Sequence, residues 1–123
     1  MLIYNHMVVG LLKAERADRV FHALADVTRR DIVVRTLEGE HSVSALARHY
    51  PMSFAAVQKH VAVLEEAGLV TKERKGREQL VRGNVDTMRQ ATALLERLEA
   101  VWTARIDRMG ELLADDNNGG TTP

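Results

Sequence analysis

The first half of the chain carries apolar residues at the three- and four-residue spacing of amphipathic helices. In ERADRVFHALAD the apolar positions share one helical face. They are Ala17, Val20, Phe21 and Leu24. A second helix is predicted over TRRDIVVRTLE, with Asp26 or Thr28 as its N-cap and Gly39 as its stop. Its inward residues are expected to be Ile32, Val33 and Leu37.

Two further helices follow, separated by a tight turn. The first lies in SVSALARHY, with Ser42 or Ser44 as its N-cap, and it ends before Pro51 because proline cannot continue a helix. Its inward residues are Leu46 and Ala47. Ser53 then caps SFAAVQKHVAVLEEA, which ends where Gly68 can adopt a left-handed conformation before Leu69. This arrangement predicts a helix-turn-helix.

Beyond Gly68 the pattern changes to two short β-type runs, LVTKER and EQLVR, joined by a two-residue loop at Lys75-Gly76. The segment TKERKGREQLVR holds five basic and two acidic residues. A basic hairpin directly after a helix-turn-helix predicts a wing that lies along the minor groove or the phosphate backbone of DNA. A second interpretation is an ordinary surface hairpin, in which Glu73 and Glu78 pair with neighbouring arginines.

A long helix is predicted from Asn84, its candidate cap, to residue 113, with two adjacent stripes along it. One stripe contains Val85, Met88, Thr92, Leu95, Glu99, Trp102, Ile106, Met109 and Leu113, and the other contains Ala91, Leu94, Leu98 and Val101. Such a helix must bury more than one side, so one side is expected to cover its own domain and the other to meet a second subunit. The predicted dimerisation residues are Leu95, Trp102, Ile106, Met109 and Leu113.

These elements divide the chain into four parts. Residues 16–83 are predicted to form a winged helix-turn-helix DNA-binding domain, and residues 84–113 a C-terminal dimerisation helix. Residues 1–15 are predicted to be a helical extension at the dimer seam, with Met1 and Met7 both open as the start. Residues 114–123, rich in Gly and Asn, are predicted to be a disordered tail. The fold class is mainly α with a small β-hairpin wing, dimeric through terminal helices.

The fourth helix has two contrasting faces. Val57, Val61 and Leu64 are expected to point inward, and the opposite face carries Ala55, Gln58, Lys59 and Ala62. Small alanines permit close approach to a surface. Gln58 could bridge adenine N6 and N7, while Lys59 could donate to guanine or to a phosphate. The alternative is a solvated helix face with no role in DNA binding.

Composition and charge are compatible with a DNA-binding module. Net charge is zero, with 17 basic and 17 acidic side chains, yet residues 28–82 hold ten basic and seven acidic ones. Residues 83–123 hold four basic and seven acidic ones, so charge is asymmetric along the chain. The absence of cysteine excludes disulfides and thiolate metal sites and suits a reducing cytoplasm. No run approaches the roughly 18 apolar residues that span a membrane.

The segment LADVTRRDIVVRTLEGEHSVSALARHYPMSFAAVQKHVAVLEEAGLVTKERKGREQLVR is similar to the ArsR-type winged helix-turn-helix repressors. The resemblance covers roughly residues 20–113, and DVTRR, SVSALA and KHVAVLEEAGLV running into KGRE are its most specific parts. It implies a homodimer on a pseudo-palindromic operator. The DNA-binding residues that it implies are Ser53, Gln58, Lys59 and His60 on the recognition helix, Arg74, Lys75 and Arg77 on the wing, and Arg29, Arg30 and Ser44 at phosphates.

Two of these residues have competing interpretations. The family often carries a small serine where Gln58 stands, so a base contact does not transfer directly to it. His60 lies in helical register with Val57 and Val61, so a partly buried, hydrogen-bonded histidine is an alternative to a base reader.

Neither a metal centre nor an active site is expected. ALARHYP lacks the cysteine of the family's thiolate site, and no histidine follows His60. The last helix therefore offers only carboxylates, a poor site for a transition metal. We expect a metal-free branch without a cofactor, in which an inducer, a partner or autoregulation relieves repression. No cysteine nucleophile, P-loop, G-x-S-x-G or HExxH motif is present, so the protein is not expected to be an enzyme.

The sequence thus predicts a cytoplasmic, homodimeric, metal-independent transcriptional repressor that binds double-stranded DNA and no membrane, with a small-molecule effector left open. The alternative is a winged-helix protein-interaction module without specific DNA binding. The salt dependence of duplex binding distinguishes the two functions, because DNA affinity that arises from phosphate contacts falls steeply as the salt concentration rises.

Overall fold

The computed structural model describes the backbone of residues 13–121 and the side chains of residues 13–114. Most of the predicted N-terminal extension lies outside these residues. The elements are α2 (Ala14–Leu24), α3 (Val27–Glu38), β1 (His41–Ser42), α4 (Val43–Ala47), α5 (Phe54–Glu66), β2 (Val70–Lys75), β3 (Glu78–Gly83) and α6 (Val85–Thr121). Within residues 13–121, no helix combines the length and the apolar run that a membrane crossing requires.

Side-chain caps fix where the short helices begin. Asp26 accepts a hydrogen bond from the Arg29 amide (3.0 Å), Ser42 from the Ala45 amide (3.0 Å) and Ser53 from the Ala56 amide (3.1 Å). The N-cap of the second helix is therefore Asp26 and not Thr28, and that of the third is Ser42 and not Ser44. The hydrogen bond from the Arg29 amide also lowers the pKa of Asp26. Each such cap contributes about 1 kcal/mol to helix stability.

The end of α5 has the predicted glycine stop. Gly68 has a φ of +77°, and the amide of the buried Leu69 donates to the Leu64 carbonyl at 2.9 Å. The same residue ties α5 to α6, because the Asn84 amide donates to the Leu69 carbonyl at 2.9 Å. Asn84 also caps α6 through its side chain, which accepts from the Asp86 amide at 3.1 Å.

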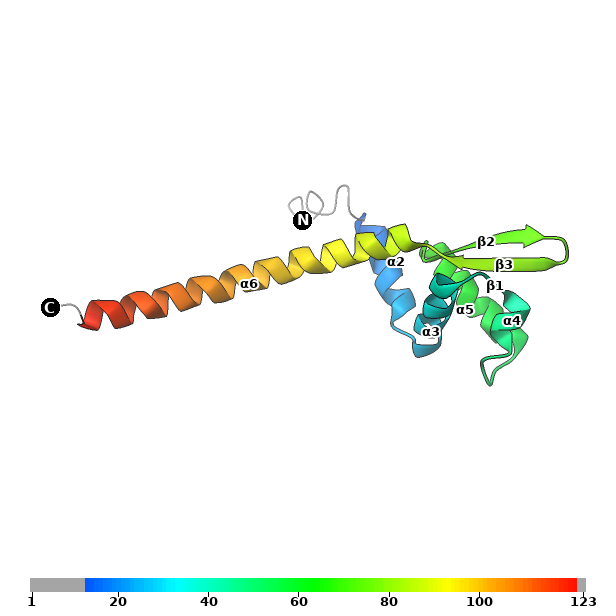
Figure 1. Cartoon of the computed structure of the whole chain (residues 1–123), viewed down its shortest axis with the longest axis horizontal. Coiled ribbons are helices and arrows are strands. Elements are labelled where there is room, and N and C mark those ends of the chain that lie inside the picture. The colour runs from blue at the N-terminus through cyan, green and yellow to red at the C-terminus, as the bar shows by residue number, and fades with distance from the viewer. Residues whose placement is uncertain (1–12, 122–123) are drawn as a thin grey trace.

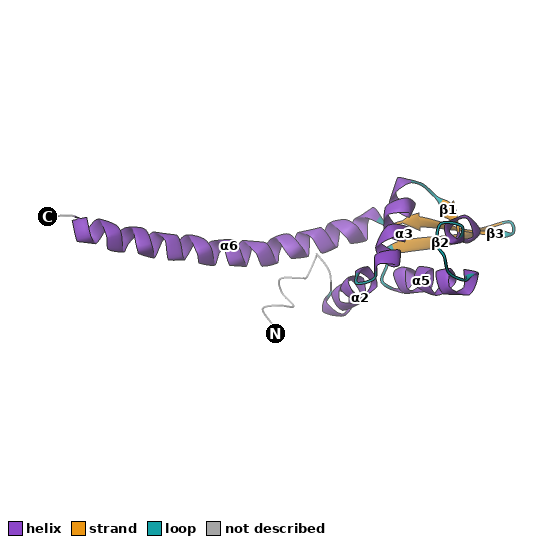
Figure 2. Ribbon diagram, turned by 90° about the horizontal axis from the view of Figure 1, so that it is seen from below, coloured by secondary structure: helices purple, strands orange, loops and turns teal. Residues whose placement is uncertain are grey.

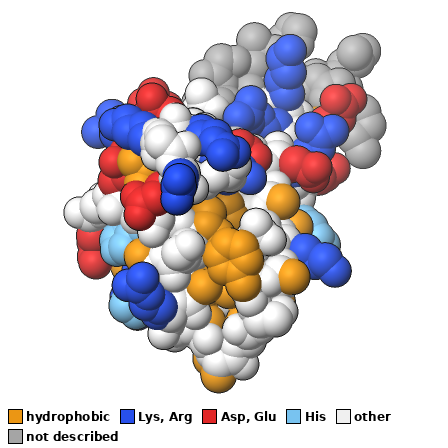
Figure 3. Space-filling view, turned by 90° about the vertical axis from the view of Figure 1, so that its right-hand side faces the viewer, with side chains coloured by type: hydrophobic (Ala, Val, Ile, Leu, Met, Phe, Trp, Pro, Cys, Tyr) orange, Lys and Arg blue, Asp and Glu red, His pale blue; other side chains and the backbone are white. Residues whose placement is uncertain are grey.

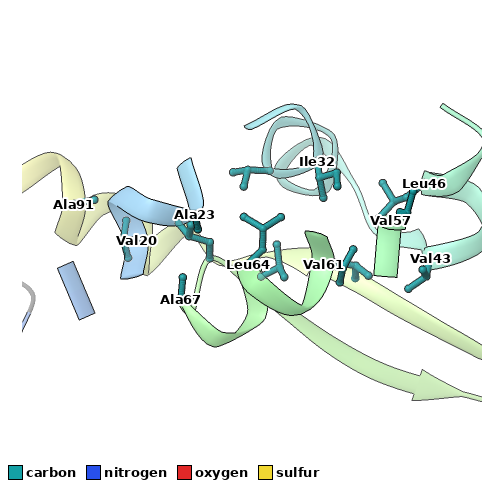
Figure 4. Packing of buried hydrophobic residues seen from close by; sticks show 14 of the residues in the cluster. Val20, Ala23, Ile32, Val43, Leu46, Val57, Val61, Leu64, Ala67 and Ala91 are labelled. Carbon is teal, nitrogen blue, oxygen red and sulfur yellow. The ribbon is translucent and has the colours of Figure 1, made fainter. Parts of the chain in front are cut away.

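The core forms where α2, α3 and α5 meet the sheet. Val57, Val61 and Leu64 are buried as predicted and point from α5 toward Ile32 on α3 (Figure 4). Leu46 closes the core from α4, and Ala91 and Leu94 close it from α6. Because α5 supplies this centre, its orientation is fixed by packing.

The second helix packs differently from the prediction at one position. Leu37, expected inward, is 42% exposed, and Thr36 is buried in its place. Burial is inexpensive for Thr36 because its hydroxyl donates to the Ile32 carbonyl at 2.8 Å. Leu37 instead lies against Gly83, where an added Cβ would approach its Cδ2 atom to 2.7 Å.

The sheet has three antiparallel strands in the order β1-β3-β2. β1 was not predicted, since a strand of two residues is too short to show alternation. The hairpin register pairs Lys75 with Glu78, so the loop is Gly76-Arg77 and the predicted loop Lys75-Gly76 is wrong by one residue. Gly76 has a φ of +63°, which suits the first loop position of a type II′ turn. Figure 2 shows the hairpin strands running beside α5.

The last helix extends away from this body. Figure 1 shows α6 leaving on the side opposite the wing. Its backbone continues to Thr121, whereas the prediction ended the helix at residue 113 and left a tail without structure. Gly and Asn weaken a helix by about 1 kcal/mol or less per residue and do not exclude one as proline does, so composition set no firm end.

Gly83 provides a test of the close contact between β3 and α3. Gly83→Ala should destabilise the fold by about 1–3 kcal/mol, because a Cβ there would lie 2.7 Å from Leu37 Cδ2 and 3.0 Å from its backbone nitrogen. Gly39→Ala is the matched control, since a Cβ at Gly39 meets nothing within 4 Å and its backbone is extended. Urea unfolding of both variants at one protein concentration measures the difference. Equal stabilities would contradict the contact.

Candidate nucleic-acid interface

The helix-turn-helix consists of α4, the turn over residues 48–53, and α5. Burial of Val57 and Val61 turns Ala55, Gln58 and Lys59 outward, and all three are exposed. We call these three residues the reading face. Their placement follows from helical geometry, because a helix that buries one side must present the other to solvent.

The turn before α5 is attached to α3 by a half-buried group of polar side chains. The Tyr50 hydroxyl donates to Asp31 Oδ2 at 2.6 Å, and Arg35 Nε donates to the same oxygen at 2.8 Å. The hydrogen bond from Tyr50, followed by that from Arg35, lowers the pKa of Asp31. Burial and the neighbouring Asp31 raise the pKa of Tyr50 to about 12, so Tyr50 keeps its proton at neutral pH and acts as the donor. The hydrogen bond between Tyr50 and Asp31 therefore fixes the position of the start of α5 relative to α3.

A groove of about 200 Å³ lies between α4, the start of α5 and the wing. Its lining residues are Val43, Ser44, Phe54, Gln58, Arg77, Glu78 and Gln79. The structure thus brings together three residues that the sequence assigned to DNA, namely Ser44, Gln58 and Arg77. Figure 3 views this end of the molecule, with hydrophobic side chains at its centre and Lys and Arg side chains above and on both flanks, acidic ones among those above.

The wing tip is exposed. Arg74, Lys75 and Arg77 are all accessible, and Arg74 Nε donates to the Gly76 carbonyl across the turn at 3.3 Å. The ion pairs among the described side chains are Arg35–Asp31, Lys72–Glu65, Arg82–Glu40 and Arg89–Asp86. They include none of the three tip residues, so the interpretation in which Glu73 and Glu78 form ion pairs with neighbouring arginines is not supported.

Unlike the exposed side chains of the wing tip, Arg29 and His60 are engaged with other groups of the protein. Arg29 donates through Nε to the Ala23 carbonyl (2.7 Å) and through Nη2 to the His22 carbonyl (3.2 Å), both at the end of α2. Its Nη1 lies 3.3 Å from His60 Nδ1. Because a guanidinium has no acceptor, Nδ1 is the acceptor in this contact. This matches the alternative of a half-buried, hydrogen-bonded histidine.

Arg30 and Ser53 keep capacity for other partners. Arg30 is exposed and donates from NH1 to the Leu24 carbonyl at 2.7 Å, which uses one of its five donors. Ser53 accepts from the Ala56 amide, so its hydroxyl proton is still available to a phosphate oxygen. Both therefore remain candidates for phosphate contacts.

Three exposed residues of the groove were not predicted from the sequence. Glu78 and Gln79 lie on β3, and their approach to α5 depends on a strand register that the sequence did not specify. Phe54 is the first residue of α5 and is 47% exposed. Its spacing to Val57 and Val61 assigns it to the inward face, so the pattern gave no signal for exposure.

The predicted dimerisation residues form an exposed apolar stripe on α6. Leu95, Trp102, Ile106, Met109 and Leu113 are between 46% and 63% exposed, while Ala91 and Leu94 near the helix start are buried against the domain. Among the described side chains, no three His, Asp or Glu residues come together as a metal site would require.

The attachment of the turn to α3 is testable through Tyr50. Tyr50→Phe removes a hydrogen bond to a carboxylate and should lower the free energy of unfolding at pH 7 by about 1–2 kcal/mol. Since the pKa of Asp31 is lowered in the folded state, this contribution is present above its ordinary value of 3.8 and is lost as the pH falls through the lowered value. The difference between the two proteins should shrink accordingly.

Two measurements check this. Urea unfolding at a series of pH values gives the stability difference, and an NMR titration of the Asp31 carboxyl should show its pKa rising toward 3.8 in Tyr50→Phe. In an Asp31→Asn background, Tyr50→Phe should cost less. An unchanged Asp31 titration would show that Tyr50 does not act on this carboxylate.

Comparisons with known proteins agree with this geometry. The model of the bacterial regulatory protein arsR family matches residues 26–72, from the cap of α3 into β2. The HTH-type transcriptional regulator Rv2034 of Mycobacterium tuberculosis is 37% identical over 105 residues, which are 85% of this chain and 94% of that protein.

Solved structures show the same fold. An ArsR-like transcriptional regulator from Rhodococcus sp. RHA1 matches with a TM-score of 0.72 and 32% identity, over 80% of this chain and 92% of that one. The homodimeric winged helix-turn-helix DNA-binding domain Mb0332 from Mycobacterium bovis, a possible ArsR-family regulator, matches with a TM-score of 0.58 and 29% identity, over 70% and 79% of the two chains. The winged helix-turn-helix, its exposed reading face and a relative matched over nearly its whole length lead to one conclusion: the chain belongs to the arsR family of bacterial regulatory proteins, DNA-binding regulators of transcription.

Proposed function

We propose that the chain is a homodimeric, metal-independent repressor that binds a pseudo-palindromic DNA operator in the cytoplasm. The observation that carries the proposal is the arrangement of one face of the molecule. The reading face, the groove and the basic wing tip lie together, and the tip arginines and lysine take part in none of the ion pairs among the described residues.

Base recognition is assigned to α5. Its N-terminal half carries Gln58 and Lys59, and the N-terminal half of a recognition helix is the part that contacts base edges in the major groove. Gln58 is proposed to bind adenine N6 and N7, with Lys59 on guanine or on a phosphate. The small side chain of Ala55 lets the helix approach the major groove of the DNA closely.

Phosphate contacts are assigned to the wing and to the flanks of α5. Arg74, Lys75 and Arg77 supply positive charge on the wing, and Arg30, Ser44 and Ser53 supply donors beside the recognition helix. Arg29 and His60, which the sequence placed among the DNA contacts, are proposed instead to position α5. Arg29 joins the end of α2 to the recognition helix through its bond to His60.

The homodimer is proposed to form through α6. The exposed stripe from Leu95 to Leu113 is a contiguous apolar surface on one helix, and such surfaces mark interaction sites. A second copy of the chain would cover it with the same stripe, as two-fold symmetry requires. The M. bovis neighbour is described as homodimeric, which supports this assembly. A dimer would place two recognition helices roughly one DNA turn apart, about 34–36 Å.

Repression then follows from occupancy of a promoter, which blocks polymerase. Metal independence is proposed because the chain has no cysteine and its last helix has no histidine. Release from the operator is assigned to a small molecule, a partner or simple autoregulation. The competing function is a winged-helix protein-interaction module without specific DNA binding.

Salt dependence tests the DNA-binding role. Arg74→Ala with Arg77→Ala should weaken binding to every duplex, because phosphate contacts carry no sequence information. The slope of log affinity against log salt should become shallower by about 0.9 for each phosphate that the variant no longer neutralises. Fluorescence anisotropy on labelled duplexes over a range of KCl concentrations measures both quantities.

The control for this experiment removes the same charge elsewhere. Arg19→Ala with Arg97→Ala changes two exposed arginines outside the wing and should leave the slope unchanged. An unchanged slope in the wing variant would refute the wing assignment. A wild-type protein that binds no duplex at any salt concentration would favour the interaction module.

The dimer is tested on α6. Trp102→Glu places a charge in the centre of the exposed stripe and should yield monomers in analytical ultracentrifugation. Ala104→Glu is the matched control, because two residues rotate a helix by about 200°, which moves the new charge off the stripe. A dimer of undiminished stability in Trp102→Glu, or equal dissociation of both variants, would argue against this surface.

A further inference from the structure

Phe54 has no part in the assignments above, although it lies among them. It is the first residue of α5, it is 47% exposed, and it lines the groove with Ser44, Gln58 and Arg77. A single exposed apolar side chain is common on protein surfaces and needs no explanation. What distinguishes Phe54 is that it shares one groove with three polar residues assigned to DNA.

We propose that Phe54 determines sequence specificity by packing its ring against the 5-methyl group of a thymine in the major groove of the operator. This inference rests on the DNA-binding function proposed above and names one feature that the operator must contain in each half-site. Gln58, which lines the same groove of the protein, binds the edge of a neighbouring base.

The chemistry of the ring restricts its partner. Among the four bases, only thymine presents an apolar group in the major groove, and phenylalanine is one of the side chains that contact it. A phenyl ring has no hydrogen-bond donor or acceptor. Against a polar base edge it would remove water without replacing the hydrogen bonds that the water made, at a cost in free energy. Thymine is therefore the base that this ring favours.

Helix geometry sets the distance to the second contact. Phe54 and Gln58 are four residues apart, so they are neighbours on one face of α5, about 6 Å apart along it. Successive base pairs are separated by about 3.4 Å, so the thymine should lie within about two base pairs of the base that Gln58 binds.

The other lining residues argue against a different occupant. Glu78 lines the groove together with Arg77, so the acidic side chain offsets the basic one, and a carboxylate can accept from an amino edge such as cytosine N4. The groove volume of about 200 Å³ is below the range of roughly 300–1,000 Å³ in which drug-sized ligands bind. A base edge is small enough to enter and matches the mixture of an aromatic ring with amide and carboxylate groups.

Removal of one methyl group tests the proposal. An operator is first selected from random duplexes with the full-length wild-type protein, and each thymine of the half-sites is then replaced by deoxyuridine, which lacks only the 5-methyl group. At one thymine per half-site, the wild-type Kd should rise about fourfold for each methyl removed, corresponding to about 0.8 kcal/mol. Phe54→Ala should bind the thymine and uracil duplexes equally.

Two further variants separate the contact from a loss of folding. Phe54→Leu keeps an apolar side chain and should keep part of the discrimination. Val34→Ala changes an equally exposed apolar residue on α3, outside the groove, and should keep all of it. Circular dichroism should show that the wild type and all three variants are folded, since Phe54 is not part of the buried core.

The possible failures can be told apart. Discrimination that persists in Phe54→Ala, or a wild-type protein that does not distinguish the two duplexes at any position, overturns the role of Phe54 while DNA binding stands. A wild-type protein that selects no duplex from the random pool overturns the proposed function, and this inference with it.

Discussion

The burial of Val57, Val61 and Leu64 is the constraint on which the DNA-facing side of the molecule depends. These side chains are at most 1% exposed and fill the space between α3 and the sheet. Since each residue turns a helix by about 100°, burying them fixes the rotation of α5 about its axis. A rotation by one residue would expose this set and bury Gln58 without partners. The core therefore determines which side chains can meet DNA, before any charge is considered.

Polar contacts then fix where α5 begins and how it is tilted. Tyr50 and Asp31 attach the turn to α3, and Arg29 attaches His60 to the end of α2. Arg29 is also half-buried, and it donates to the Ala23 carbonyl and to the His22 carbonyl, which also accepts from the Ala25 amide at the end of α2. These bonds occupy donors of the Arg29 guanidinium that a phosphate contact would also need. Basic residues in this fold therefore divide into those that hold the framework and those that remain free.

The sequence predicted the framework well because its signals are local. Caps at Ser42 and Ser53, the left-handed Gly68 and the inward face of α5 each depend on a few neighbouring residues, and the structure confirms them. Contacts between distant segments were not accessible in this way. β1 forms by pairing with β3, Leu37 is partly exposed and lies against Gly83, and Phe54 is exposed because the buried residues of α5 begin only at Val57. The contacts of Arg29 were not accessible for the same reason, since its partners lie on α2 and α5.

A chain without net charge can still bind a polyanion when its charges are separated. At physiological ionic strength, interactions between exposed charges are largely screened beyond about 8 Å. α6 and its excess of acidic residues extend on the side opposite the wing, so they weaken the field of Arg74, Lys75 and Arg77 little (Figure 1). Glu73 and Glu78, by contrast, lie within the hairpin and do reduce it. Affinity from phosphates alone should therefore be modest, which leaves contacts with base edges at Gln58 and in the groove to supply much of the discrimination between sequences.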